Sequence, residues 1–531
     1  MTKQRLQKLI HKTERGQAII LIAFAIIGLV AMVGLVTDTG ILLIEYGKLK
    51  RGVDAAAVAA AQQYRLQGNA LDQAALENAA KNFLQLNQST DLVEDSVIVH
   101  SCASPVADRP ALCNPDPVNH PNDNRKLVEV IATKNVYFGF LRVIGIESTT
   151  VTANAVGEAA TIDLVLVIDT SGSMAYETDG VAGQGAGDDP SVCNLSDTCQ
   201  PMKVVKDTAL AFLDTLYISN DPNNSYDRVA VIVMTSQNPG GDRNPREVLA
   251  LTSNKAAIVS AINGIKVFEP RVCDPDNILL GSCLNYPGGN FEAICQTWVW
   301  SRDPNIHDDP VQARADADPS SCPSSNVGGA LRLAREALVN DPAPRLDAFW
   351  VVVSLLGGPA NATDENEAAG YPNGYCPRYT WTDSWLANGG DHCRDRYPSV
   401  RHTDTDVAPY TNPISGETFD DLSIYDADDF ARDKADDLAT AISGDGVTVF
   451  TIGLGAPIKS TSTVAAGEKP AAEALLQYIA ECAGEDSPDD CATPVTSPVI
   501  NHGQYFYAPN NLALADIFDR IAKNIATKIS Q

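Results

Sequence analysis

The sequence predicts an α/β fold, a doubly wound and mainly parallel sheet, preceded by an N-terminal transmembrane helix. Ile162–Ile168 is apolar except for Asp163, which is typical of a parallel strand buried on both faces. Further apolar runs alternate with segments of helical periodicity, and that alternation indicates a parallel sheet. The N-terminal helix is predicted by Ala18–Val36, which holds no charge and would cross about 28 Å as a helix.

The first residues of the chain, 1–16, are basic, with Glu14 as the single acidic residue. The positive-inside tendency therefore places this end in the cytoplasm and everything after a transmembrane helix at 17–37 outside. A cleaved signal peptide is the alternative. A retained anchor is favoured because the apolar run is longer than a usual signal peptide and no small-x-small cleavage site follows it at once. We expect a single-pass protein of the cell membrane.

Residues 38–160 are expected to form a stalk. Helical character continues through Ile41–Gln67, which is rich in alanine, the best helix former. Farther along, Leu127–Thr133 and Ser148–Gly157 are predicted as strands around a short apolar turn at Phe138–Ile146. The prediction is a helical stalk with a small β region.

The N-terminal part, about residues 15–160, resembles the TadE/TadG-like proteins of the Tad (Flp) pilus assembly machinery. The resemblance rests on the apolar span and on Arg15-Gly16-Gln17-Ala18, Asp38 and Asp54-Ala55-Ala56. A pilin-like member of this machinery would be cleaved after Gly16, but Leu21 stands where mature pilins usually carry glutamate.

A cluster of oxygen-bearing side chains follows the first predicted strand of the sheet. Asp169, Ser171 and Ser173 stand at its carboxyl end, where open α/β sheets bind ligands. Mg²⁺ prefers oxygen ligands and usually keeps several waters, so one tight turn can supply part of its shell. The alternative is that these residues cap the following helix.

From about residue 161 to 530 the chain resembles the von Willebrand factor type A family, whose metal-ion-dependent adhesion site begins with Asp-x-Ser-x-Ser. Ser325-Asn326-Val327-Gly328-Gly329 is similar to the second segment of that site, with Ser325 in place of the usual threonine. The resemblance implies a Rossmann-like fold and a metal site made by Asp169, Ser171, Ser173 and Ser325.

The third segment of that site departs from the family. Leu356-Gly357-Gly358 stands where the family usually has Thr-Asp-Gly, so the third-loop carboxylate is missing. The resemblance therefore implies a degenerate Mg²⁺ site. Asp364 or Glu365 could compensate for the lost charge.

The remaining predicted elements complete the doubly wound sheet. The apolar stripe of the last helix is expected to pack in the core rather than to bind a partner. These elements are the strands Asp227–Met234, Phe349–Leu356 and Val447–Ile452, and the helices Ala256–Ile265, Asp428–Ile442 and Leu512–Ile525.

The twelve cysteines favour an oxidising compartment, in agreement with an outside location. No cysteine or histidine pattern has zinc spacing. Eight cysteines fall in local pairs: Cys102 with Cys113, Cys193 with Cys199, Cys376 with Cys393, and Cys482 with Cys491. Four more lie in one insertion and allow three pairings: Cys273, Cys283, Cys295 and Cys322.

Three long insertions, near 175–200, 268–323 and 362–426, adjoin the segments of the candidate site. Their Asp, Asn, Pro, Gly and Cys content predicts disulfide-stapled surface loops that form a rim around Asp169. Aromatic residues are favoured at interfaces, although packing within the loops is an equal alternative. The aromatic candidates for partner contact are Trp298, Trp300, Tyr379, Trp381 and Trp385.

The net charge is −28, and residues 1–51 contribute +5 from eight Lys or Arg and three Asp or Glu. The remaining −33 argues against nucleic acid as a partner. An anchor of TadE/TadG type before a type A domain is the arrangement expected of TadG-like proteins. We therefore expect an extracytoplasmic protein of Tad-type pilus assembly or surface adhesion that binds a protein partner, either a pilus component or a surface ligand.

A pilin-like structural subunit, in which the type A domain is not a metal-dependent binder, is the alternative. An enzyme is not expected, because Ser171 lacks a Gly-x-Ser-x-Gly elbow and no base can be assigned to it.

Overall fold

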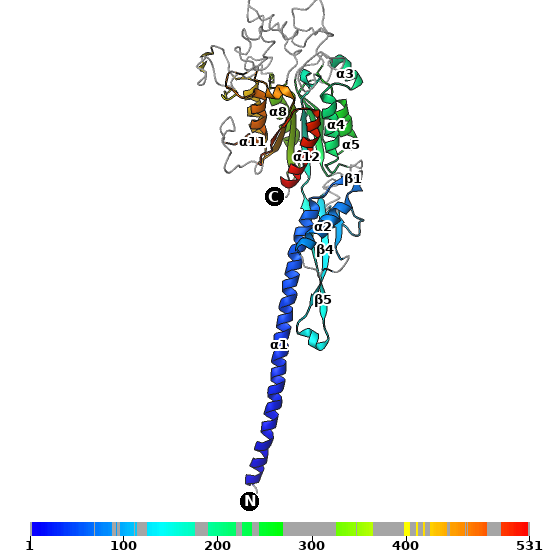
Figure 1. Cartoon of the computed structure of the whole chain (residues 1–531), viewed down its shortest axis with the longest axis vertical. Helices are drawn as coiled ribbons and strands as arrows, with labels where there is room; N and C mark the ends of the chain where they lie inside the picture. The colour runs from blue at the N-terminus through cyan, green and yellow to red at the C-terminus, as the bar shows by residue number, and fades with distance from the viewer. Residues whose placement is uncertain are drawn as a thin grey trace, which may run out of the picture. The chain divides into compact units, whose positions relative to one another are not determined.

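The computed structural model divides into two compact units, Met1–Ala159 and Ala160–Ile529 (Figure 1). The backbone is described from residue 3 to 528, and side chains from residue 18. The residues between these limits that lie outside the description are 68–69, 88–91, 93–95, 111, 114–124, 176–189, 219–225, 236–243, 269–324, 347, 365–397, 404–409, 412–417, 420–424, 443–445, 462–463, 465 and 486–500.

The first unit is built on one 59-residue helix, α1 (Lys3–Ala61). It contains a stretch within Ala18–Ala61 that is long and apolar enough to cross a membrane, a property that anchors and signal sequences share. The helix ends at Ala61, so the predicted continuation to Gln67 is wrong. The chain turns there, Tyr64 is buried, and Leu66–Gln67 pairs as β1 with β2 (Ala70–Leu71).

The carboxyl half of α1 forms a core with α2 (Gln73–Asn87) and a three-stranded antiparallel sheet. The strands are β3 (Ile98–Ser101), β4 (Lys126–Tyr137) and β5 (Ser148–Ala159), so both predicted strands are confirmed. Gly157 lets β5 approach α1, because a Cβ at this position would lie 2.3 Å from the carbonyl oxygen of Ala57. The turn between β4 and β5 holds a short 3-10 helix, η1 (Leu141–Ile144).

The second unit contains a six-stranded sheet in the order β13-β12-β9-β6-β7-β8. All neighbouring strands are parallel except β8, which runs antiparallel to β7 at one edge. The strands are β6 (Ile162–Ile168), β7 (Arg228–Val233), β8 (Arg246–Thr252), β9 (Phe349–Leu356), β12 (Thr448–Leu454) and β13 (Tyr505–Ala508). The predicted mainly parallel α/β fold is confirmed.

Helices cover both faces of this sheet (Figure 1). The alternating side chains of β6 divide between two cores, with Leu164 and Leu166 in one and Val165 and Val167 in the other. The first core includes α4 (Met202–Leu213), α5 (Lys255–Gly264) and α12 (Asn511–Lys528). The second includes α8 (Val327–Val339), α10 (Ala427–Ala439) and α11 (Ala471–Glu481). The apolar stripe of the last helix is confirmed as core packing.

Asp163, the one acidic residue of β6, is held at the amino end of the strand. Arg228 donates to it from Nε at 2.9 Å and from a terminal nitrogen at 2.7 Å, and Arg345 forms a second ion pair. Burial acts to raise the pKa of Asp163, but the bonds from the two arginines outweigh it and hold the pKa below its ordinary value. This carboxylate is therefore charged and fully compensated.

Candidate metal-binding site at the carboxyl edge of the sheet

Asp169 follows β6 and is completely buried. Its backbone N–H donates to the carbonyl of Leu355 at 2.9 Å, which continues the pairing of β6 with β9. One carboxylate oxygen accepts from the N–H of Ser171 at 2.8 Å, and the other accepts from the N–H of Gly357 at 2.9 Å. Two neighbouring strand ends thus fix the orientation of this side chain.

Ser325 reaches the same carboxylate from the loop before α8. Its hydroxyl lies 3.4 and 3.3 Å from the two oxygens of Asp169. The loop is held by Asn361, whose side chain accepts from the N–H of Ser325 at 2.7 Å and whose N–H donates to the carbonyl of Ser325 at 3.2 Å. Asn361 was not among the predicted site residues, although an Asn in the short Gly-Gly-Pro-Ala-Asn loop that follows β9 is a usable signal.

The two remaining predicted ligands lie at the start of η2 (Gly172–Ala175). The hydroxyls of Ser171 and Ser173 lie 2.8 Å apart. The hydroxyl of Ser173 is also 2.9 Å from the place where a Cβ on Gly357 would stand, and a carboxylate oxygen of Asp169 is 3.6 Å from that place. The fold therefore brings Asp169, Ser171, Ser173 and Ser325 together from two separate loops, while Gly357 contributes backbone from a third.

This donor set fits a hard divalent cation only in part. One carboxylate oxygen and three hydroxyls make four ligands, which leaves two positions of an octahedral Mg²⁺ shell to water or to a partner. Within the part of the chain that the structure describes, no group of three or more His, Cys, Asp or Glu side chains is placed to hold a metal ion. A cation at these oxygens would be bound with little compensating charge, and weak affinity is the physical consequence.

Gly357 lacks the carboxylate of the family's aspartate, and it also occupies a place with little room for a side chain. A Cβ added at this position would lie 2.9 Å from both the sulfur of Met174 and the hydroxyl of Ser173, closer than side chains tolerate. The adjacent Gly358 has open space at the same point. The third-loop aspartate of the resembled family therefore requires a shift of the Met174 and Ser173 side chains if it is to stand at position 357.

Asp364 does not replace the missing carboxylate. Its oxygens accept from the side-chain amide of Asn326 at 2.9 Å and from Arg332 Nε at 2.7 Å. Both donors belong to the start of α8, so the suggestion that Asp364 compensates is wrong for this arrangement. Glu365, the other suggested residue, lies outside the described residues.

The electrostatics of Asp169 are opposite to those of Asp163. Burial raises the pKa of Asp169, and the hydrogen bonds from Ser171, Gly357 and Ser325 only partly counter that rise. A divalent cation on these oxygens would favour the charged form.

A further polar contact joins the turn after β6 to the end of β7. The hydroxyls of Thr170 and Thr235 lie 2.7 Å apart in the buried layer. Thr235 was also not among the predicted site residues, although it immediately follows the predicted strand Asp227–Met234.

The described ends of two insertions are attached beside this turn. The N–H of Phe268, where the second insertion begins, donates to the carbonyl of Thr170 at 2.8 Å. Asn194, at the end of the first insertion, donates to the carbonyl of Val267 at 2.8 Å and accepts from its N–H at 2.9 Å. Both insertions therefore start or end at the candidate site.

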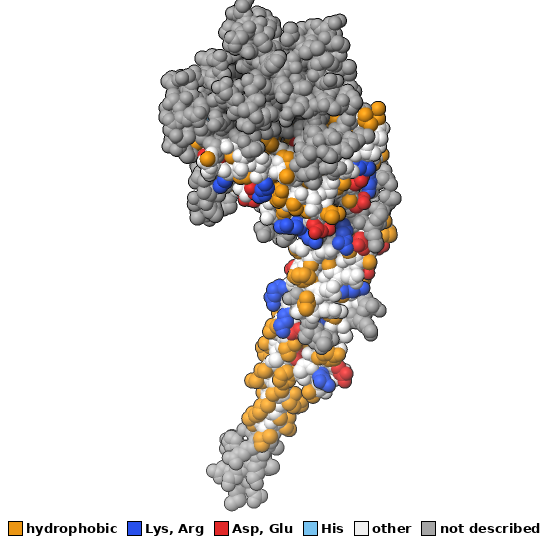
Figure 2. Space-filling model, turned by 45° about the horizontal axis from the view of Figure 1, so that its top comes forward, with side chains coloured by type: hydrophobic (Ala, Val, Ile, Leu, Met, Phe, Trp, Pro, Cys, Tyr) orange, Lys and Arg blue, Asp and Glu red, His pale blue; other side chains and the backbone are white. Residues whose placement is uncertain are grey.

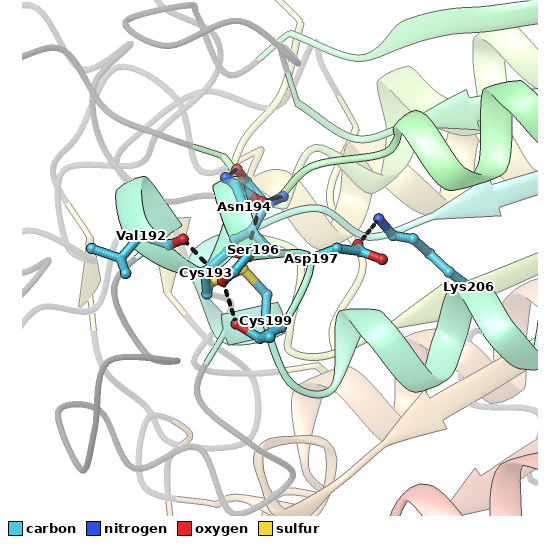
Figure 3. The surroundings of a disulfide bond; sticks show 9 residues. Val192, Cys193, Asn194, Ser196, Asp197, Cys199 and Lys206 are labelled. Carbon is cyan, nitrogen blue, oxygen red and sulfur yellow. Dashed lines mark hydrogen bonds and ion pairs between the residues drawn. A yellow bond between two sulfur atoms is a disulfide. The ribbon is translucent and has the colours of Figure 1, made fainter.

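A disulfide fixes the end of the first insertion (Figure 3). Cys193 in α3 (Pro190–Ser196) bonds to Cys199, as predicted, and Asp197 between them pairs with Lys206 of α4 at 2.5 Å. The predicted Cys102–Cys113 bond of the first unit is also present. Cys482 is disulfide-bonded, and its predicted partner Cys491 lies outside the described residues.

The predicted partner-contact residues and the remaining cysteines lie outside the described residues: Trp298, Trp300, Tyr379, Trp381, Trp385, Cys273, Cys283, Cys295, Cys322, Cys376 and Cys393.

Comparisons with known proteins give distant structural similarity only. No family model and no curated protein matches the sequence. The PilB minor pilin from Streptococcus sanguinis is similar at 14% identity and a TM-score of 0.34, over 76% of this chain and 76% of that chain. The vWF domain of the type V pili tip protein Mfa5 from Porphyromonas gingivalis is similar at 14% identity and a TM-score of 0.33, over 70% of this chain and 97% of that domain. The pilus adhesin SpaC from Lactobacillus rhamnosus GG is similar at 14% identity and a TM-score of 0.34, over 82% of this chain and 34% of that chain.

Proposed function

We propose that this chain is a membrane-anchored extracytoplasmic protein of Tad (Flp)-type pilus assembly or surface adhesion, which binds a protein partner at the carboxyl edge of its sheet. The observation that carries the binding site is the convergence of Asp169, Ser171, Ser173 and Ser325 at one edge. The Tad assignment rests on the sequence resemblance of the anchor and on the order of anchor and sheet domain.

In this proposal Asp169 and the three serine hydroxyls hold a divalent cation. The cation would supply open coordination positions for a carboxylate of the partner. The hydrogen bonds from Ser171 and Gly357 orient Asp169, while Asn361 holds the Ser325 loop in place. The insertions that begin and end beside Thr170 would supply specificity around this point.

Isothermal titration of the full-length protein in detergent with Mg²⁺ and with Mn²⁺ tests the proposal. We expect saturable heat that is lost in Asp169→Asn. Asp364→Asn is the matched control, because it removes a carboxylate of the same sheet edge that is bonded to α8, and its titration should match that of the native protein. Absence of heat in a protein shown to be folded would make the cluster structural and would contradict metal-dependent binding.

The alternative is a pilin-like structural subunit. In that case the exposed apolar surface of α1, for example at Phe24 and Met32, would pack against the same helix of other subunits. N-terminal sequencing of the protein from membranes distinguishes the two, since cleavage after Gly16 supports the subunit and an intact basic N-terminus supports the anchor.

A further inference from the structure

The turn between β4 and β5 carries an apolar surface. No residue of η1 is buried, and Val143 and Ile144 are 86% and 71% exposed. Tyr137, Phe140 and Ile146 add further exposed apolar area beside them. We call these five residues the hairpin tip. Orange side chains in Figure 2 mark hydrophobic surface in this part of the first unit.

The hairpin tip is fixed at one level along α1. The carboxylate of Asp38 accepts from the backbone N–H groups of Gly139 at 2.8 Å, Phe140 at 3.0 Å and Leu141 at 2.7 Å. One turn earlier, Phe140 packs against Gly34, where an added Cβ would lie 2.8 Å from the Cβ of Phe140. The tip therefore lies beside the helix between Gly34 and Asp38 (Figure 1).

This level lies near the end of the apolar stretch of α1. Between Ala18 and Ile44 the only charged residue is Asp38, and a helix of that length spans roughly 40 Å. The hydrocarbon core of a bilayer is about 30 Å thick. Counted from Ala18, about 30 Å takes the helix to residue 37, so the hairpin tip lies at the outer boundary of that core and the surplus of about 10 Å follows it. Charged contacts begin immediately above it, with Glu45 bonded to Lys134 at 2.7 Å and to Lys48 at 2.7 Å.

Polar groups on this segment are satisfied within the protein. The hydroxyl of Thr37 donates to the carbonyl of Val33 at 2.9 Å, and that of Thr39 donates to the carbonyl of Leu35 at 2.7 Å. Asp38 is 1% exposed, because the hairpin covers it. The N–H groups at the start of η1 lack helical partners, so the carboxylate and the turn satisfy each other. Such mutual satisfaction is needed where water is scarce.

We propose that the hairpin tip inserts into the outer interfacial layer of the same lipid bilayer that α1 crosses. This inference rests on the proposed membrane anchor. It is supported by the continuity of the tip with the apolar stretch of the helix, and by Arg142, which is exposed between the apolar residues and can reach lipid phosphates from there.

Depth-dependent fluorescence quenching in liposomes tests the inference. Full-length protein carries an environment-sensitive dye on a single introduced cysteine, in phosphatidylcholine vesicles with or without lipids bearing a shallow nitroxide. The tip variant is Val143→Cys. Leu86→Cys on α2 is the matched control, with a native side chain 83% exposed in the same unit, and Val30→Cys reports on the anchor. We expect several-fold stronger quenching at position 143 than at position 86.

The outcomes separate the tip from the anchor. Quenching at 30 and 143 but not at 86 supports the inference. Quenching at 30 with equal signals at 143 and 86 overturns it and leaves the anchor intact. Absence of quenching at all three positions overturns both. A dye at 143 that is shielded from aqueous iodide but not quenched by the nitroxide lipid is covered by protein, and this result also overturns the inference.

Discussion

The two ends of strand β6 treat a buried carboxylate in opposite ways. At the amino end, Asp163 is paired with Arg228 and Arg345, and its pKa is lowered. At the carboxyl end, the described residues that donate hydrogen bonds to Asp169 are neutral, among them Ser325 and Gly357, and burial raises its pKa. At the amino end, the negative charge is neutralised by the arginines, so the role of Asp163 is structural. At the carboxyl end, the oxygens of Asp169 have hydrogen-bond partners but the negative charge is not neutralised, and this condition suits a cation-binding site.

The largest effect is expected from removing the charge of Asp163 at the amino end of β6. Asp163→Asn removes the buried carboxylate that pairs with Arg345 and that Arg228 contacts in addition to Asp341, and we expect the free energy of unfolding to fall by about 3–5 kcal/mol. Urea denaturation measures it. Asp364→Asn breaks the partly exposed pair with Arg332 and should cost no more than about 1 kcal/mol. Equal losses in the two variants would contradict the contrast between the two kinds of pairing.

At the carboxyl end of β6, the stability of the protein should depend instead on a cation bound at Asp169. Mg²⁺ at a hundredfold excess over its dissociation constant should stabilise the native protein by about 2.7 kcal/mol. Asp169→Asn should abolish this gain, because it removes the only charged ligand of the cluster. Thermal unfolding with and without Mg²⁺ measures the difference. A variant that keeps the full Mg²⁺ effect would place the cation elsewhere.

The next largest effect on stability is expected from adding a side chain at Gly357. Gly357→Ala should cost about 1–3 kcal/mol, because the new methyl group overpacks the turn at Ser173 and Met174. Gly358→Ala is the neighbouring control, with open space at its Cβ, and should be close to neutral. Chemical denaturation of both variants checks the pair. A neutral Gly357→Ala would show that the turn yields easily and that an aspartate could be restored there.

The smallest effect is a pH dependence. Because the folded pKa of Asp163 is below the ordinary value of 3.8, its stabilisation is fully present above that pH and is lost as the pH falls through the folded pKa. The gap in unfolding free energy between the native protein and Asp163→Asn should therefore narrow below about pH 3.8, at about 1.4 kcal/mol per unit at most. A gap that stays constant down to pH 2 would contradict the ion-pair assignment.

The sheet was predictable because its strands carry unambiguous patterns. Ile162–Ile168 and Phe349–Leu356 match the structure, since buried parallel strands are nearly continuous apolar runs. The antiparallel edge strand Arg246–Thr252 was not predicted, because its exposed residues weaken the pattern. The end of α1 was placed too late, since alanine content gives no sign that Tyr64 turns into the core.

The site was predictable in its ligands but not in its surroundings. The spacing of Asp169, Ser171 and Ser173 shows that they share one turn, and strand order brings Ser325 near them. That Gly357 leaves no room for a side chain depends on the place of Met174, which belongs to a different loop. Likewise the ion pair of Asp364 with Arg332 spans 32 positions of sequence, and such pairings follow only from the folded chain.

The continuity of α1 has a mechanical consequence for the first unit. The helix runs without interruption from its apolar stretch to Ala61, and residues such as Leu49 and Val53 near its far end belong to the core of that unit. A continuous helix of 59 residues, about 88 Å long, transmits tilt and torque from one end to the other. Force applied to the three-stranded sheet of this unit would therefore act on the apolar N-terminal part of α1. A change in the tilt of that part would likewise reorient the sheet.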